Sequence, residues 1–271
     1  MKTIIALTNF SKSSYNAVKY AADMAKILQA ELVLMHVVQL PVSFEVPLSE
    51  YEFNAMQQEA QDELAKLKTM LLLRTGAEII ISTKVITGTM LHEIEGVCAT
   101  KKPFLVVMGT ERRSWTERFV FGSNTFNSVK NLHYPVLVVP QDAVFRGINR
   151  IVLASDCKDV DELPLEILRE LVDVFHASVD ILHVSTNNGD ELKSAVNFQI
   201  VKHRFDEFNP RTFFVSGDNI EQAINSYAEE NNDDLVMVIA RKHTFFQSLV
   251  HKSQSSHITL KPHIPVLAVA E

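Results

Sequence analysis

One stretch in the first half of the chain combines glycine, hydroxyl and amide side chains in a spacing that suits phosphate binding. It begins with Met108-Gly109, where an apolar run ends, and it closes with Gly-Ser-Asn-Thr at residues 122–125. Glycine lets a ligand approach the backbone closely. The N–H groups of a starting helix, with Ser and Thr hydroxyls beside them, hold phosphate oxygens without a basic residue. A Gly-Ser pair is equally typical of a plain helix N-cap, so both roles stay open.

Other polar residues follow the ends of apolar runs. Thr8 and Asn9 follow the first run and Val38 ends the second, while Ser155 and Asp156 take the place of Thr8 and Asn9 in the second half. Ligands of doubly wound parallel sheets bind beyond the carboxyl ends of the strands, where the strand order reverses. These strand ends are therefore expected to meet at one edge.

The elements that must position these residues occur twice. The runs that begin at Ile4 and Glu31 return at Ile151 and Ser178, both 147 residues later, and the run from Pro135 returns at Pro265, 130 residues later. Three ordered matches indicate a tandem duplication, in which the second copy is shorter in its middle. The expected domains are residues 1–142 and 148–271, with a short joint near 141–149.

Short apolar runs alternate with helix-period stretches, which is typical of βαβ units. The expected fold is α/β, with two tandem doubly wound, flavodoxin-like domains, each a five-stranded mainly parallel sheet with helices on both faces. The expected strands are 3–7, 31–37, 79–85, 104–108, 136–139, 151–155, 179–184, 212–215, 235–239 and 266–269. The expected helices are 15–28, 49–73, 90–100, 124–132, 164–175, 191–205, 219–230 and 253–260.

Composition excludes several classes. The 271 residues are 46% hydrophobic and 22% charged, and the formal net charge is −7. Residues 1–142 hold 14 basic and 14 acidic groups, so the acidity lies in the second half. No basic block indicates a nucleic-acid partner. No apolar run is long enough for a membrane span, and the opening residues have no signal-peptide pattern. We expect a cytoplasmic protein without a disulfide framework.

The whole chain resembles a tandem universal stress protein of the UspA family. Ala-Leu-Thr-Asn-Phe-Ser at residues 6–11 is similar to the family's strand-one signature, usually P-T-D-F-S. The loop after Met108 resembles its nucleotide motif, G-x2-G-x9-G-[ST], with Gly109 as the first glycine and Gly122-Ser123 as the last pair. Two positions depart from the pattern: Asn9 replaces the family's Asp, which contacts the nucleoside, and Arg112 replaces its second glycine.

The resemblance implies a stress-response protein that binds ATP or AMP, with Mg²⁺ as an optional companion, in its first copy. It also implies that the last strands of the two copies pair, and that two chains form a homodimer. The second copy keeps Asp156 but has Ala240 and Lys252-Ser253 where glycines are needed, so its site is expected to be degenerate. The expected nucleotide-binding residues are Thr8, Asn9, Val38, Met108, Gly109, Arg112, Gly122, Ser123, Asn124 and Thr125.

Two alternatives remain. One is an interaction scaffold in which both sites have decayed, and the other is a weak ATPase, for which Glu111 and Glu117 are the nearby carboxylates. No catalytic residue and no metal site is assigned, so we expect a binding or regulatory protein rather than an enzyme. His36 and His183 end matched strands and are expected to pack there with one ring nitrogen bonded. Cys98 is expected to be a small buried residue.

Overall fold

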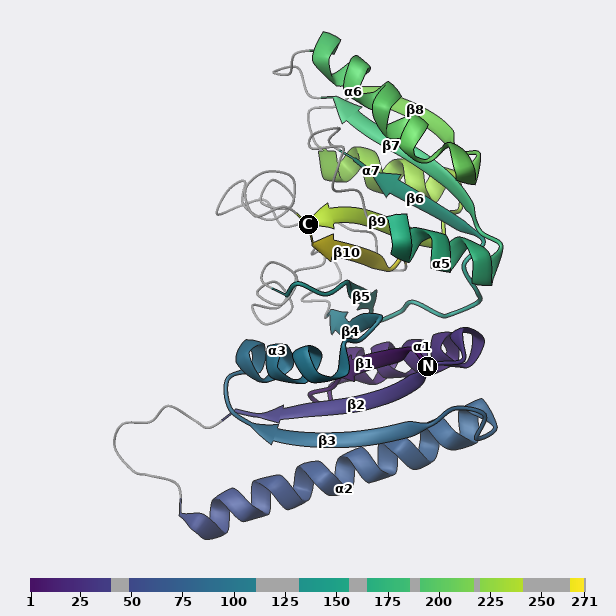
Figure 1. The fold of residues 1–271 in the computed structure, drawn as a ribbon. Helices are drawn as coiled ribbons and strands as arrows, with labels where there is room; N and C mark the ends of the chain where they lie inside the picture. Colours follow the sequence, from purple (N-terminus) through teal and green to yellow (C-terminus); the bar gives the residue numbers. More distant parts are fainter. Residues whose placement is uncertain are drawn as a thin grey trace.

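A computed structural model describes residues 1–39, 49–110, 132–155, 165–185, 191–216, 220–240 and 264–270. Its strands form one sheet of ten, in the order β3-β2-β1-β4-β5-β10-β9-β6-β7-β8 (Figure 1). The strands are β1 Thr3–Leu7, β2 Glu31–Val38, β3 Ile81–Thr87, β4 Leu105–Thr110, β5 Val136–Pro140, β6 Arg150–Ala154, β7 Ser178–Ser185, β8 Arg211–Ser216, β9 Leu235–Ala240 and β10 Val266–Ala270. Each half contributes five strands, as predicted.

The helices flank the sheet. They are α1 Lys12–Leu28, α2 Glu50–Thr75, α3 Met90–Lys101, α5 Leu165–Phe175, α6 Glu191–Arg204 and α7 Ile220–Glu230, with a short 3-10 helix, η2, at Asp206–Phe208. Every predicted strand overlaps an observed one, which confirms the predicted fold class. Within the described ranges, no helix is long and apolar enough to cross a membrane.

Several predicted boundaries were wrong, among them those at β3, at α6 and at residue 132. Strand β3 begins at Ile81 rather than at Ile79, because the apolar pair Ile79–Ile80 precedes the strand and Ile80 is exposed. Helix α6 ends at Arg204, before Phe205. Phe205 is buried in the apolar core and begins the turn into η2. The predicted helix 124–132 is not helical at Leu132. Its other residues, and the predicted helix 253–260, lie outside the described residues.

Local sequence explains where helices begin. The hydroxyl of Ser11 accepts from the backbone of Ser14 and caps α1, whereas Ser49 and Glu52 form a reciprocal capping box at the start of α2. Such caps satisfy backbone N–H groups that have no partner inside the helix. The pattern S-x-x-E is a sequence signal for a helix start, so this boundary is encoded locally.

Two apolar layers cover the faces of the sheet. One packs α1, α2, α5 and α6 against it, with Leu64, Leu67 and Leu71 of α2 buried there. The other packs α3 and α7 against the opposite face. Cys98 of α3 belongs to the second layer, and burial, followed by the charge of Glu95, raises the pKa of its thiol to about 12. The prediction that Cys98 is a small core residue is confirmed.

The two halves meet through their last strands. Strands β5 and β10 pair antiparallel, with Leu137 opposite Leu267, whereas the other adjacent strands pair parallel. This confirms the predicted pairing of the last strands. The joint is fastened to α1, because Asn16 Nδ2 donates to the carbonyl oxygens of Pro140 at 2.9 Å and Ala143 at 2.8 Å. In addition, one cluster of buried apolar side chains includes residues of both halves.

Candidate functional site

The strand order reverses between β1 and β4 in the first half, which makes this the expected ligand crevice. Of the predicted residues, Thr8 and Asn9 follow β1, Val38 ends β2, and Met108 and Gly109 lie near the end of β4. All five positions are at the carboxyl edge of the sheet. Arg112, Gly122, Ser123, Asn124 and Thr125 lie outside the described residues, so their contribution stays a prediction.

Asn9 belongs to the cap of α1. Its Oδ1 atom accepts from Ser11 N at 3.2 Å and from Ser11 Oγ at 2.7 Å. Since a backbone N–H only donates, the amide oxygen must face Ser11 and the Nδ2 group must take the other side. Asn9 is exposed, and among the described residues its Nδ2 group has no hydrogen-bond partner. The side chain therefore offers a ligand a donor, where an aspartate would offer an acceptor.

Thr8 is buried and organises the turn after β1. Its hydroxyl lies 3.1 Å from Ser14 Oγ and accepts from the backbone N–H of Phe10 at 3.0 Å. The carbonyl of Thr8 accepts from His36 Nδ1 at 2.8 Å, and the His36 ring stacks on Phe10 with centroids 4.6 Å apart. The expected role of His36, packing with one nitrogen bonded, is confirmed.

Sequence reasoning did not single out Phe10. This residue adopts a φ of 63°, in a left-handed region that costs energy for a side chain without local polar compensation. The stacked His36 ring and the bond to Thr8 hold it there. No residue-level signal announces such a conformation, because it is imposed by contacts between β1, β2 and the start of α1.

Gly109 has a structural task that its sequence context did not reveal. A β-carbon at this position would lie 2.6 Å from the carbonyl oxygen of Ser13 and 2.9 Å from the backbone nitrogen of Ser14. Real side chains do not tolerate such distances. Glycine therefore lets the first turn of α1 press directly on β4. The expected role, close approach of a ligand, stays a prediction beside this structural role.

The remaining described site residues, Met108 and Val38, have buried side chains. Met108 is buried in the apolar layer with α3, so its side chain packs in the core. Val38 is also buried, and its carbonyl accepts from Gly88 N at 3.2 Å. Any contact of these residues with a ligand therefore runs through the backbone.

The second copy repeats the strand-end geometry. Ser155 N donates to Leu182 O at 3.0 Å, as Thr8 N donates to Met35 O at 3.0 Å. His183 Nδ1 lies 2.9 Å from the carbonyl of Ser155, matching the His36 contact, so the predicted role of His183 is also confirmed. Asp156 and the segment after Ala240 lie outside the described residues. The prediction that this second site is degenerate therefore stays a prediction.

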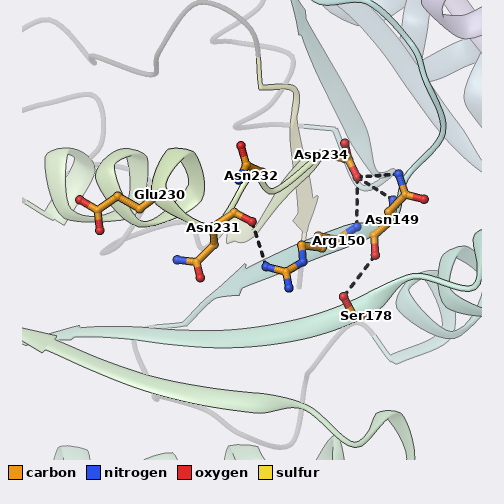
Figure 2. Close-up of a pocket in the computed structure, with 7 residues that line it drawn as sticks. All are labelled: Asn149, Arg150, Ser178, Glu230, Asn231, Asn232 and Asp234. Carbon is orange, nitrogen blue, oxygen red and sulfur yellow. Dashed lines mark hydrogen bonds between the residues drawn. The ribbon is translucent and has the colours of Figure 1, made fainter.

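A separate polar hollow lies in the second half, at the edge of the sheet opposite to the carboxyl ends of the strands (Figure 2). It has a volume of about 470 Å³ and sits at the amino ends of β6 and β7 beside the end of α7. Its lining residues are Asn149, Arg150, Ser178, Glu230, Asn231, Asn232 and Asp234. Asp234 Oδ2 accepts from the backbone N–H groups of Asn149 at 2.7 Å and Arg150 at 3.1 Å. Because it lies at the amino edge, this hollow is not the second copy of the crevice.

Two five-stranded doubly wound halves, joined edge to edge through β5 and β10, define a tandem class of α/β proteins. A model described as the Universal stress protein family matches residues 1–140, slightly more than half of the chain. The chain therefore belongs to the universal stress protein family. Over 144 residues it is 33% identical to Universal stress protein MJ0531 of Methanocaldococcus jannaschii, covering 51% of this chain and 81% of that protein.

Solved structures support the tandem fold. A universal stress protein from Archaeoglobus fulgidus superposes with a TM-score of 0.77 at 18% identity, covering 99% of this chain and 98% of that chain. A protein from Pseudomonas aeruginosa, described as a putative universal stress protein, superposes with a TM-score of 0.62 at 13% identity, covering 100% and 93%. At these identities the likeness concerns the fold alone, and it extends over both halves.

Proposed function

We propose that this universal stress protein binds an adenine nucleotide, ATP or AMP, in the crevice between β1 and β4 and acts through its conformation or through partner contact. The observation that carries the proposal is the polar turn at the switch point, where Asn9 offers an amide donor beside the capped start of α1. The family resemblance supplies the ligand class, because the loop from Gly109 to Ser123 resembles the family's nucleotide motif.

The electrostatics of the crevice agree with an anionic ligand. The first turn of α1 contains no acidic residue, and a helix N-terminus carries a partial positive charge. Ser13 and Ser14, both buried, place further polar groups at this turn. The proposal assigns the nucleoside to the Thr8–Asn9 side and the phosphates to the loop after β4. Mg²⁺, if used, would accompany the phosphates.

The first test exploits Asn9, because one substitution is expected to improve binding. Asn9→Asp keeps the Oδ1 acceptor that caps Ser11, and it replaces the outward donor with a charged acceptor for a ribose hydroxyl. A hydrogen bond to a charged group contributes about 1 kcal/mol more than a neutral one. We therefore expect ATP and AMP to bind about fivefold more tightly, measured by calorimetric titration with Mg²⁺ present. A gain in affinity cannot arise from a damaged fold.

Two further variants complete this test. Asn9→Ala removes both groups and is expected to weaken binding, while Gly122→Val is expected to abolish it with the unfolding transition retained. Binding that all three variants leave unchanged would overturn the nucleotide proposal. A folded wild-type protein that binds neither nucleotide at millimolar concentration would favour the scaffold alternative. A phosphate-release assay run in parallel addresses the ATPase alternative, with Glu111→Gln and Glu117→Gln as its probes.

The proposal extends to organisation and assembly. We keep residues 1–142 and 148–271 as the limits of the two domains, cytoplasm as the location, and a homodimer as the assembly in solution. Sedimentation velocity tests the last point directly. A species of one chain's mass, 30.6 kDa, at micromolar concentration would contradict the homodimer.

A further inference from the structure

A buried cluster of ionisable side chains lies in the second half, away from the proposed nucleotide site. At its centre is Asp180 of β7, which is only 2% exposed. Arg211 of β8 binds it through two hydrogen bonds, one of them 2.8 Å long from Nε to Oδ1, and Tyr227 of α7 donates to its Oδ2 at 2.9 Å. Asp180 is therefore paired and satisfied.

Asp233, which follows α7, is not satisfied. Its side chain is only 5% exposed, and neither carboxylate oxygen has a hydrogen-bond partner among the described residues. An ionised carboxylate buried in this way is strongly unfavourable, because it loses hydration and forms no hydrogen bond in return. Ionisable groups act on it from every neighbouring element. They are Asp180 of β7, Arg150 of β6, Arg211 of β8, Tyr227 of α7 and the adjacent Asp234.

The charges around Asp233 do not compensate it in this arrangement. Arg211 is already engaged by Asp180. Arg150 donates instead to the carbonyl oxygen of Asn231 at 2.9 Å, at the end of α7 and on the wall of the polar hollow (Figure 2). A proton on Asp233 removes the buried negative charge. Burial, followed by the charge of Asp180, raises the pKa of Asp233 to about 7.

The cluster is particular to the second copy. The duplication places Val33 of β2 at the position of Asp180, and Val33 pairs with Ser82 where Asp180 pairs with Arg211. A valine and a serine, which cannot form an ion pair, stand at the equivalent place of the first half, so the fold does not require the ion pair. The polar cluster is an addition to the common architecture.

We propose that Asp233 is a proton-binding site whose ionisation draws Arg150 away from the Asn231 carbonyl, so that the end of α7 and the polar hollow have two arrangements. With the proton bound, Arg150 stabilises the end of α7. Without it, Arg150 is the cation that can reach the bare carboxylate, because Arg211 remains held by Asp180. The second half would then respond to pH, independently of nucleotide in the first.

The primary experiment compares the free energy of unfolding of the wild type, Asp233→Asn and Asp173→Asn between pH 4 and pH 9. Asp173 of α5 is exposed and serves as the matched control. A raised pKa in the folded state means that the folded protein binds the proton more tightly. The contribution of this proton to the free energy of unfolding is thus complete below a pH of about 4 and is lost as the pH rises to about 7. We expect Asp233→Asn to lose this dependence, and Asp173→Asn to keep it.

Two measurements keep the proposal testable if Asp233→Asn folds poorly. Carboxyl-carbon NMR of the wild-type protein should show one Asp that binds its proton roughly a thousandfold more tightly than an exposed Asp. Arg150→Gln should raise the pH at which this carboxyl titrates, because it removes a nearby positive charge. Arg169→Gln, which breaks an exposed ion pair, should not change that pH. Hydrogen-exchange protection of the Asn231 and Asp233 amides, corrected for intrinsic rates, should fall above the midpoint. The proposal would be refuted if the carboxyl of Asp233 titrated with a midpoint near pH 4. It would also be refuted if amide protection did not change at the titration midpoint.

Discussion

Replacing Gly109 with alanine is expected to destabilise the first half by about 2–3 kcal/mol, the upper part of the range for overpacking a tight contact. The new β-carbon would lie 2.6 Å from the Ser13 carbonyl oxygen. The obstacle is backbone, in strand β4 on one side and in the first turn of α1 on the other, so no rotamer change relieves it. Chemical denaturation of the full chain measures the loss.

The same substitution is expected to disturb the proposed site. Displacement of α1 moves Ser14, which contacts the hydroxyl of Thr8 at 3.1 Å, and Ser11, which holds Asn9. Nucleotide affinity should therefore fall together with stability. This distinguishes Gly109→Ala from Gly122→Val, for which we expect loss of binding with the fold retained.

Gly96 provides the matched control. It lies in α3, and a β-carbon there would meet no atom within 4 Å. Because alanine is a much better helix former than glycine, Gly96→Ala should stabilise the protein by about 0.5–1 kcal/mol. Opposite signs for one chemical change at two glycines would show that the contact with α1 causes the loss. A neutral result at Gly109 would mean that α1 and β4 are not pressed together.

Replacing Arg211 with methionine is expected to cost about 3 kcal/mol, the lower end of the range for breaking a buried ion pair. Among the described residues, Tyr227 would then be the one hydrogen-bond donor left to the buried partner, Asp180. Asp233 would lose a nearby positive charge at the same time. The lower end applies because the Arg211 side chain is 48% exposed, so water screens part of the interaction.

An exposed ion pair of similar geometry tests this explanation. Arg169 binds Glu207 with two hydrogen bonds, of 2.6 and 3.4 Å, but both side chains are 46% exposed. Arg169→Met should change the free energy of unfolding by less than about 1 kcal/mol. The double variant Asp180→Asn/Arg211→Met should recover much of the loss, since no bare charge stays buried. If the two arginine variants behave alike, burial of Asp180 is not what makes Arg211 important.

The alternation of apolar runs and helix-period stretches was sufficient to predict the ten strands and their doubly wound arrangement. Strands that are buried on both faces have continuous apolar sequences, and S-x-x-E and related caps mark helix starts within a few residues. The internal repeat predicted more than the order of the elements. Because His36 matches His183, the strands that contain them were expected to end at equivalent places. Both rings do bond the carbonyl that follows β1 or β6.

The candidate site was only partly predictable. Thr8, Asn9 and Gly109 were named from their places after strands, and those places are correct. Phe10 and the hydroxyl network of Ser11 and Ser14 were missed, because their importance arises from contacts between elements. The contact of Gly109 with α1 was also missed, since the sequence pattern resembles a ligand motif whether or not a helix lies against the glycine.

The chain by itself determined the elements, their duplication, the family and the residues available at the strand ends, since each of these depends on local pattern and spacing. Only the tertiary structure decided which of those residues meet. Asp180, Arg211 and Tyr227 come from three elements and Asp233 from the connection after α7. In the sequence, Asp180 is one polar residue within an apolar strand. Strand register places Arg211 beside it, and the packing of α7 excludes water from Asp233. Burial and proximity are properties of the packed molecule, so the ionisation of these groups could not be predicted from the sequence.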